Sequence, residues 1–245
     1  MVLLFICGCA SAPQETATTT AHFESPIETT SQWPEPDKLV ALTFDDGPSK
    51  TTMAEILDIL AEYDAKATFF IIGNKINSAT LPILQRAVDE GHELGNHGMN
   101  HLEMAELTDD EIRSEYFDCQ DAVKQAVGVE MYYFRAPFGS VDDRMFQIIQ
   151  TPFINSGAKA ADGTIGSIAA DRAWRVTSGA YDGCIIGMHC FQGNSETVEA
   201  LKTILPELKA QGYRFVTVSE LFTECGYEIP VATPGIRFTD NKPLE

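Results

Sequence analysis

Short apolar runs alternate along the chain with stretches that place apolar residues at helical spacing. Short apolar runs are typical of buried strands, and apolar positions three and four residues apart are typical of amphipathic helices. The pattern predicts strands at residues 38–44, 67–72, 92–96, 132–135, 153–155, 184–189 and 213–218. It predicts helices from about residue 51, at 81–90, 108–127 and 141–149, from about 198 to before Gly212, and shortly after 218. Repeated strand–helix units predict an α/β fold with a parallel sheet, either doubly wound or closed as a barrel.

Two of these helices begin at a capping residue. Thr108 is the predicted N-cap of the helix at 108–127, and Glu111 three residues later completes a capping box. Ser219 is predicted to cap the short last helix. The folded domain is expected at residues 38–227, followed by a C-terminal tail at 228–245.

The first residues resemble a targeting signal. Residues 1–9 are apolar but far shorter than the roughly 20 residues that span a bilayer. They fit the hydrophobic part of a secretory signal, although no Lys or Arg precedes Lys38. The segment ICGC at residues 6–9 is similar to a bacterial lipobox, in which Cys9 would receive the lipid. Cleavage without lipidation and a buried first strand are the alternatives.

Residues 10–37 are rich in Thr, Ser, Pro and Glu and lack apolar periodicity. Such a segment cannot bury enough apolar surface to fold, so we predict a flexible tether. A tether behind a lipid anchor would let the domain reach outward from a membrane. We therefore predict an extracytoplasmic bacterial protein, either a membrane-anchored lipoprotein or a secreted protein.

Composition narrows the possible partners. The chain has 17 Lys and Arg against 36 Asp and Glu, a net charge of −19. Phosphate-rich partners need basic residues, so this balance argues against nucleic acid and against anionic membrane surfaces. Contact with a membrane is expected only through the lipid anchor, and a neutral or weakly cationic substrate fits the charge better. Hydrophobic residues make up 44% of the chain, which excludes wholesale disorder.

Four cysteines lie within the predicted domain, at positions Cys119, Cys184, Cys190 and Cys225. They could form two disulfides in three pairings in an oxidising compartment. A continuous strand would hold Cys184 and Cys190 roughly 20 Å apart, which is too far for them to join to each other. We expect buried free thiols.

Two acidic residues follow the first predicted strand in the segment TFDDGPS, Asp45 and Asp46. Neighbouring carboxylates repel each other, so this pair needs a cation or an Arg nearby. The alternative is a plain turn, because Asp, Gly, Pro and Ser are common turn residues. Polar residues at the carboxyl ends of parallel strands are where α/β proteins place their sites.

Three of the five histidines fall within ten residues, in the segment GHELGNHGMNH. The four-residue spacing of His97 and His101 would put both imidazoles on one side of a helical turn, which is a common way to present two nitrogens to zinc. An accidental spacing is the alternative.

Two further residues end predicted strands. Arg135 stands at the start of RAPFG, where it could hold a carboxylate bidentately or form a surface salt bridge. His189 ends the apolar run CIIGM, where it is either a proton donor facing a site or a satisfied core residue.

Taken in order, TFDDG, NHxxxH, RAPFG and IIGMH resemble the motifs of the polysaccharide deacetylase family, also called the NodB-homology domain or carbohydrate esterase family 4. The segment GYRFVTVSEL, after a helix such as TVEALKTILPELKAQ, is also similar to the end of that domain. The resemblance covers residues 38–227. It implies a distorted (β/α) barrel in a single domain, with the site at the carboxyl ends of the strands.

The resemblance implies a metal triad of Asp46, His97 and His101. The metal is usually Zn²⁺, and another divalent transition metal such as Co²⁺ is an alternative. Two imidazoles and one carboxylate leave open positions for water and the substrate carbonyl. A backbone N–H at Phe138 or Gly139 would help to stabilise the oxyanion.

The resemblance also implies a proton-transfer pair. Asp45 matches the general base, and Arg135 matches the residue that orients it and pairs with its charge. His189 matches the general acid that protonates the leaving group.

The family's Asp–Trp pair, which tunes this histidine and walls the sugar groove, has no intact copy. By its spacing before His189, Asp162 matches the Asp, whereas Gly163 stands where the Trp would be. Asp171 and Trp174 are the competing candidates.

Three other positions depart from the family pattern. Gly98 replaces the hydroxyl residue that follows the first metal histidine, Gly187 stands two residues before His189 where a Leu is usual, and Cys190 replaces a common Asp. These changes leave the implied metal ligands and base intact and alter the surroundings of the substrate.

The implied activity is metal-dependent hydrolysis of N-acetyl groups on a glycan that contains N-acetylglucosamine, such as cell-wall peptidoglycan or a chitin-like polymer. Hydrolysis of O-acetyl esters on xylan-type glycans is an enzymatic alternative that needs His189 less, because an alkoxide leaves more easily than an amine. A surface glycan-binding lipoprotein without turnover is the alternative outside the enzymes.

Overall fold

The computed structural model describes residues 37–226 and 237–238. The predicted signal at 1–9 with Cys9, nearly all of the predicted tether, and most of the predicted tail lie outside the described residues. Among the described residues, no helix combines the length and the apolar character needed to cross a bilayer.

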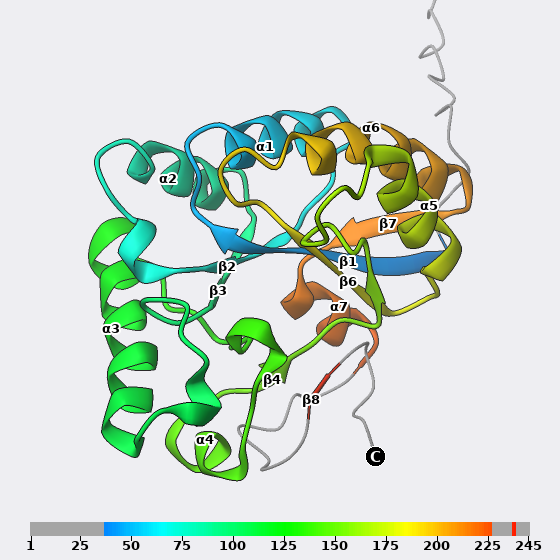
Figure 1. The fold of residues 1–245 in the computed structure, drawn as a ribbon. Helices are drawn as coiled ribbons and strands as arrows, with labels where there is room; N and C mark the ends of the chain where they lie inside the picture. The colour runs from blue at the N-terminus through cyan, green and yellow to red at the C-terminus, as the bar shows by residue number, and fades with distance from the viewer. Residues whose placement is uncertain (1–36, 227–236, 239–245) are drawn as a thin grey trace, which may run out of the picture. The chain divides into compact units, whose positions relative to one another are not determined.

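The described part of the chain alternates strands and helices, as Figure 1 shows. The strands are β1 (Lys38–Gly47), β2 (Thr68–Ile71), β3 (Glu93–Asn96), β4 (Phe153–Ile154), β5 (Ala158–Lys159), β6 (Cys184–His189), β7 (Tyr213–Val216) and β8 (Arg237–Phe238). The α-helices are α1 (Thr52–Glu62), α2 (Leu81–Asp89), α3 (Asp109–Val127), α4 (Asp143–Ile148), α5 (Ala169–Gly179), α6 (Ser195–Ala210) and α7 (Val218–Glu224). Short 3-10 helices are η1 (Gly73–Lys75), η2 (Met104–Glu106) and η3 (Pro137–Gly139).

The main sheet is parallel, as predicted. Its strand order is β3-β2-β1-β6-β5, and β7 also pairs with β1. The register of β1 and β6 places Asp45 opposite His189. Isolated parallel bridges join Phe134 to Asn96 and to Phe153, and β4 pairs with β8. The two residues that carry the predicted base and acid therefore lie level with each other, at the carboxyl ends of neighbouring strands.

The central strand β1 is buried on both faces, and its residues alternate between two cores. Val40, Leu42 and Phe44 belong to the larger core, which includes the buried faces of α1 and α6. Ala41 belongs to a second core that includes α7. Because strand side chains alternate with a period of two, the positions that follow Ala41 on its face are the polar residues at the end of the strand.

Several predicted boundaries were wrong for identifiable reasons. The predicted strand at 132–135 is a single bridge residue, Phe134, because the chain enters η3 at Pro137. β5 and α5 were not predicted. The buried residues of α5 are Arg172, Ala173 and Val176, so the apolar pattern of this helix is weak.

The last helix begins at a different cap from the predicted one. Thr217, not Ser219, caps α7, and Glu220 completes its capping box. The Ser219 hydroxyl instead donates a hydrogen bond to the partly buried carboxyl of Glu93. The capping box predicted at Thr108 and Glu111 is confirmed.

Cysteine burial follows the prediction at three of the four positions. Cys119, Cys184 and Cys190 are buried, whereas Cys225 is exposed at the end of α7. Burial raises the pKa of Cys119 to about 12, so this thiol stays protonated near neutral pH.

Replacing Thr108 with Ala should lower the free energy of unfolding by about 1 kcal/mol, because the α3 N-terminus loses its capping oxygen. Urea unfolding monitored by circular dichroism measures this change. Ser114→Ala, on an exposed position of the same helix, is the matched control and should have little effect. Equal stability losses in both variants would show that the capping box contributes nothing.

Candidate active site

The two acidic residues at the end of β1 are brought to one cavity by an irregularity in the strand. The register between β1 and β2 shifts between Phe44 and Gly47. Asp46 lies in this irregular segment with a φ of 70°, a left-handed conformation that Asp and Asn tolerate better than most residues. Both carboxylates consequently line the same cavity instead of alternating between the two faces of the sheet. The predicted strand therefore does not stop before these residues but includes them.

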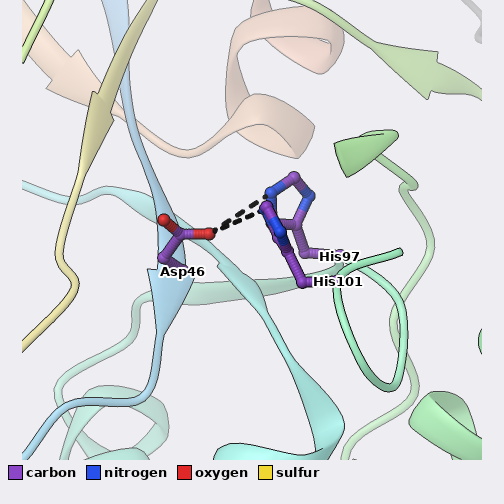
Figure 2. A group of neighbouring side chains, drawn as sticks. All are labelled: Asp46, His97 and His101. Carbon is purple, nitrogen blue, oxygen red and sulfur yellow. Dashed lines mark ion pairs between the residues drawn. The ribbon is translucent and has the colours of Figure 1, made fainter. Parts of the chain in front are cut away.

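The three predicted metal ligands lie together (Figure 2). Asp46 Oδ1 is 3.1 Å from His101 Nε2 and 3.7 Å from His97 Nε2, and the three candidate ligand atoms all lie within 4.8 Å of one another. The four-residue spacing of the histidines predicted a helical turn, and this prediction was wrong. The histidines stand at the two ends of a loop in which Gly98 and His101 both have positive φ, 80° and 59°.

The chemistry of this group fits a divalent metal. Asp46 Oδ1 is buried and makes no hydrogen bond in the described structure. His97 Nδ1 lies 2.6 Å from the carbonyl oxygen of Arg135, so a proton on Nδ1 is donated there and Nε2 is left with a lone pair toward Asp46. Zn²⁺ and Co²⁺ both accept such a set of two imidazoles and one carboxylate.

Electrostatics favour the protonation states that such ligands need. Burial alone would raise the pKa of Asp46, but the His101 and His97 imidazoles lower it to about 2. Burial lowers the pKa of His97, and this effect outweighs the attraction of Asp45 and Asp46 for a proton on the ring. An ionised carboxylate therefore faces an imidazole that favours its neutral form.

Arg135 is buried, and its side chain connects the end of β1 with the backbone at residues 154 and 155. Its Nη1 donates hydrogen bonds to Asp45 Oδ1 and to Thr43 Oγ1, each at 2.8 Å. Its Nε and Nη2 donate to the carbonyl oxygens of Ile154 and Asn155. The guanidinium also lies 4.1 Å from the centre of the Phe70 ring. Arg135 pairs with Asp45 inside the protein and not in a surface salt bridge, but through Nη1 alone and not bidentately, because Nε and Nη2 bond backbone carbonyl oxygens.

His189 faces the same cavity and is held by Asp162. His189 Nδ1 lies 2.7 Å from Asp162 Oδ1, and the His189 N–H donates to Asp162 Oδ2 at 2.7 Å. Burial alone would lower the pKa of His189, but Asp162 reverses this effect and the net shift is upward. The competing candidates, Asp171 and Trp174, are exposed on α5. The geometry therefore favours Asp162, the choice made from spacing.

A network that the sequence analysis missed supports Asp162. The Thr197 hydroxyl donates to Asp162 Oδ2 at 2.8 Å, and Asn194 Nδ2 donates to the His189 carbonyl oxygen at 3.0 Å. The buried guanidinium of Arg172 donates to both Asn194 and Thr197. No short motif marks these residues, because they come from α5 and the start of α6.

The cavity has a volume of about 500 Å³, and the predicted site residues line it: Asp45, Asp46, His97, His101, Arg135, Asp162 and His189. Phe138 stands at its rim with 71% of its surface exposed and its ring against that of His101. The Gly139 N–H donates to the carbonyl oxygen of Ala136, which leaves the Phe138 N–H as the candidate oxyanion donor of the two. A neighbouring cavity of about 400 Å³ shares Asp162, Gly163 and Phe191 with it.

Comparison with known proteins identifies the family. A family model described as polysaccharide deacetylase matches residues 33–151. The chain is 38% identical to a peptidoglycan-N-acetylglucosamine deacetylase from Bacillus cereus, over 77% of this chain and 90% of that protein. The chain belongs to the polysaccharide deacetylase family.

Two other relatives of this polysaccharide deacetylase bear on its fold and chemistry. It is 48% identical to a bifunctional xylanase/deacetylase from Pseudobutyrivibrio xylanivorans, over 76% of this chain but only 30% of that larger protein. It superposes with a TM-score of 0.79 on a family 4 acetyl xylan esterase from Clostridium thermocellum in complex with a cobalt ion, at 37% identity over 83% of this chain and 98% of that one. The predicted distorted (β/α) barrel in a single domain is confirmed.

The surroundings of the four positions that depart from the family pattern differ from one position to the next. A Cβ on Gly187 would lie 2.7 Å from Ser156 Oγ, so the Ser156 side chain fills the space beside this strand residue. A Cβ on Gly163 would meet only His189 Cε1, at 3.9 Å, so the space beside this residue is open. A Cβ on Gly98 would lie 3.2 Å from the carboxylate of Glu115. Cys190 is buried and its Sγ lies 3.2 Å from the carbonyl oxygen of Asp45.

If His101 is one of three metal ligands, His101→Ala should weaken Co²⁺ binding more than the roughly 10–100-fold that loss of a neighbouring, non-ligand partner costs. Cobalt absorption titrations measure the dissociation constant. His92→Asn is the matched control, since an amide oxygen can replace the Nδ1 atom that accepts from the Ala67 N–H. Undiminished cobalt binding by His101→Ala would exclude this histidine from the ligand set.

Proposed function

We propose that this polysaccharide deacetylase is a divalent-metal-dependent hydrolase that removes acetyl groups from an extracytoplasmic glycan, with acetylated xylan as its first candidate substrate. The observation that carries the proposal is the convergence of three groups on one cavity. These groups are the Asp46–His97–His101 cluster, the Arg135–Asp45 pair and the Asp162–His189 pair.

Asp46, His97 and His101 would hold the metal, with zinc as the expected ion and cobalt as a substitute. When bound, the metal would supply Lewis acidity toward the acyl oxygen and the attacking water. The buried, unbonded Oδ1 of Asp46 and the fixed tautomer of His97 support this assignment.

Asp45 would accept the proton of the attacking water. Arg135 keeps this carboxylate oriented and compensates its charge beside Asp46. The Phe138 N–H would donate to the oxyanion that develops on the acyl group.

His189 would donate a proton to the leaving oxygen or nitrogen. Because Asp162 raises its pKa, the imidazolium persists to higher pH than for an unpaired histidine. Asp162 accepts from Nδ1, which leaves Nε2 as the proton donor toward the cavity.

Acetylated xylan is the first candidate because two of the relatives have names that refer to xylan. They are the xylanase/deacetylase at 48% identity and the cobalt-bound acetyl xylan esterase. N-acetylglucosamine in peptidoglycan is the second candidate. It is supported by the Bacillus cereus relative, which this chain matches over 90% of its length, and by the Asp162–His189 pair, since an amine leaving group requires a proton donor. The targeting segment predicted at residues 1–9 agrees with either glycan, and lipidation of Cys9 stays a prediction.

The deciding experiment measures acetate release by the zinc-loaded chain from acetylated xylan, peptidoglycan and N-acetylglucosamine oligomers, with and without a chelator. Chelator-sensitive release that is fastest from xylan would support the first candidate. Faster release from either N-acetylated substrate would replace it with the second. Release that is unaffected by the chelator would overturn the metal-dependent mechanism.

Asp45→Asn should lower kcat by about 10²–10⁴-fold, because the general base is lost while the side chain keeps nearly the same shape. The metal ligands remain, so cobalt binding should persist. Asp143→Asn, at an exposed position of α4, is the matched control. Full activity of Asp45→Asn would exclude Asp45 as the base.

Asp162→Asn should shift the alkaline limb of the kcat/KM profile to lower pH. The upward shift in the pKa of His189 depends on Asp162, and a general acid is active only below its pKa. The loss should be larger on N-acetyl substrates than on an activated aryl acetate, whose leaving group needs no proton. An unchanged alkaline limb would contradict the assignment of His189 as the acid.

A further inference from the structure

Glu115 is a buried carboxylate of α3 that lies against the loop carrying the two histidines. It is 4% exposed, and no ion pair to it is found among the described residues. Its two oxygens accept hydrogen bonds from one residue, Asn100: Oε2 from the backbone N–H at 2.8 Å and Oε1 from the side-chain amide at 2.6 Å. A buried carboxylate is costly unless such bonds satisfy it.

Asn100 immediately precedes His101, whose φ is 59°. A non-glycine residue in this conformation is strained and persists only where its surroundings hold it. The Asn100 side-chain oxygen also accepts from Asn74 Nδ2, at 3.1 Å, so the residue is fixed from η1 as well as from α3. The backbone just before His101 therefore has few alternative positions.

His97 and His101 are oriented in different ways. The His97 ring is fixed by the Arg135 carbonyl oxygen, whereas the contacts found for the His101 ring are with Asp46, His97 and the exposed ring of Phe138. The direction of His101 consequently depends on the backbone from which it projects (Figure 2).

Gly98 makes room for this arrangement. A Cβ at Gly98 would lie 3.2 Å from Glu115 Oε2, tighter than ordinary van der Waals contact, and the φ of 80° disfavours any side chain there. A hydroxyl residue at this position and a carboxylate at Glu115 would therefore compete for the same space.

We propose that Glu115 is a positioning residue for the metal site: it clamps Asn100 and so holds His101 in the direction required of a ligand. This inference rests on the proposed metal triad. Glu115 does not touch the cavity, so its effect should reach the metal through His101 alone.

The test is a double-mutant cycle on Co²⁺ affinity, measured by absorption titration, with apo-protein stability recorded for each variant. Glu115→Gln should weaken cobalt binding about 10–100-fold, as expected for a group that orients a ligand. In a His101→Ala background the same substitution should change the cobalt affinity by no more than about twofold, because the histidine through which Glu115 acts is already absent. Asp118→Asn, exposed on the same helix, should bind cobalt like the unmodified chain.

Asn100→Ala removes one of the two hydrogen bonds between Asn100 and Glu115 and leaves α3 unchanged. This variant replaces Glu115→Gln in the test if Glu115→Gln does not fold. It should weaken cobalt binding severalfold, with apo stability close to that of the unmodified chain. Unchanged affinity in a folded Glu115→Gln or Asn100→Ala variant would overturn the inference. An equal loss in the presence and absence of His101 would also overturn it. Absence of cobalt binding by the unmodified chain would instead contradict the proposed metal triad itself.

Discussion

The site depends on one buried cation. Asp45 and Asp46 place two carboxylates side by side at the end of the central strand, an arrangement that is unfavourable without a compensating charge. The guanidinium of Arg135 donates a hydrogen bond to Asp45. The backbone carbonyl oxygen of the same residue orients His97, which lies beside Asp46. The other guanidinium nitrogens bond the carbonyl oxygens of residues 154 and 155, so the charge compensation and the geometry of the cavity have the same origin.

Two helices act as supports for this centre. Glu115 on α3 reaches the loop between the histidines, and Thr197 on α6 reaches the carboxylate of Asp162. The first contact holds Asn100, the residue before His101, and the second holds Asp162, the partner of His189. Hydrogen bonds of this kind hold side chains in one orientation, so the reactive groups are positioned before substrate arrives.

Where a motif carries its own chemistry, sequence reasoning chose residues that the structure brings to one cavity. Asp46, His97, His101, Arg135 and His189 could be chosen because strand ends and spacing mark them, and Asp162 could be chosen by its distance from His189. Sequence reasoning failed where the backbone conformation depends on residues that are far away in the sequence. The histidine loop is not helical, because Gly98 and His101 take left-handed conformations, and Glu115 has no local signal because its partner lies fifteen residues away across the loop.

The left-handed backbone of Asp46 constrains how this chain can diverge. Besides Asp itself, the residues that adopt a φ near 70° most readily are Gly and Asn, and each differs from Asp by a single nucleotide. Both would keep the strand irregularity and remove the charge. The substitutions that the fold tolerates best at this position are thus the ones that remove the carboxylate of the proposed metal site. A single change at this position can therefore leave the barrel and its cavity in place while it removes the carboxylate from the proposed metal site.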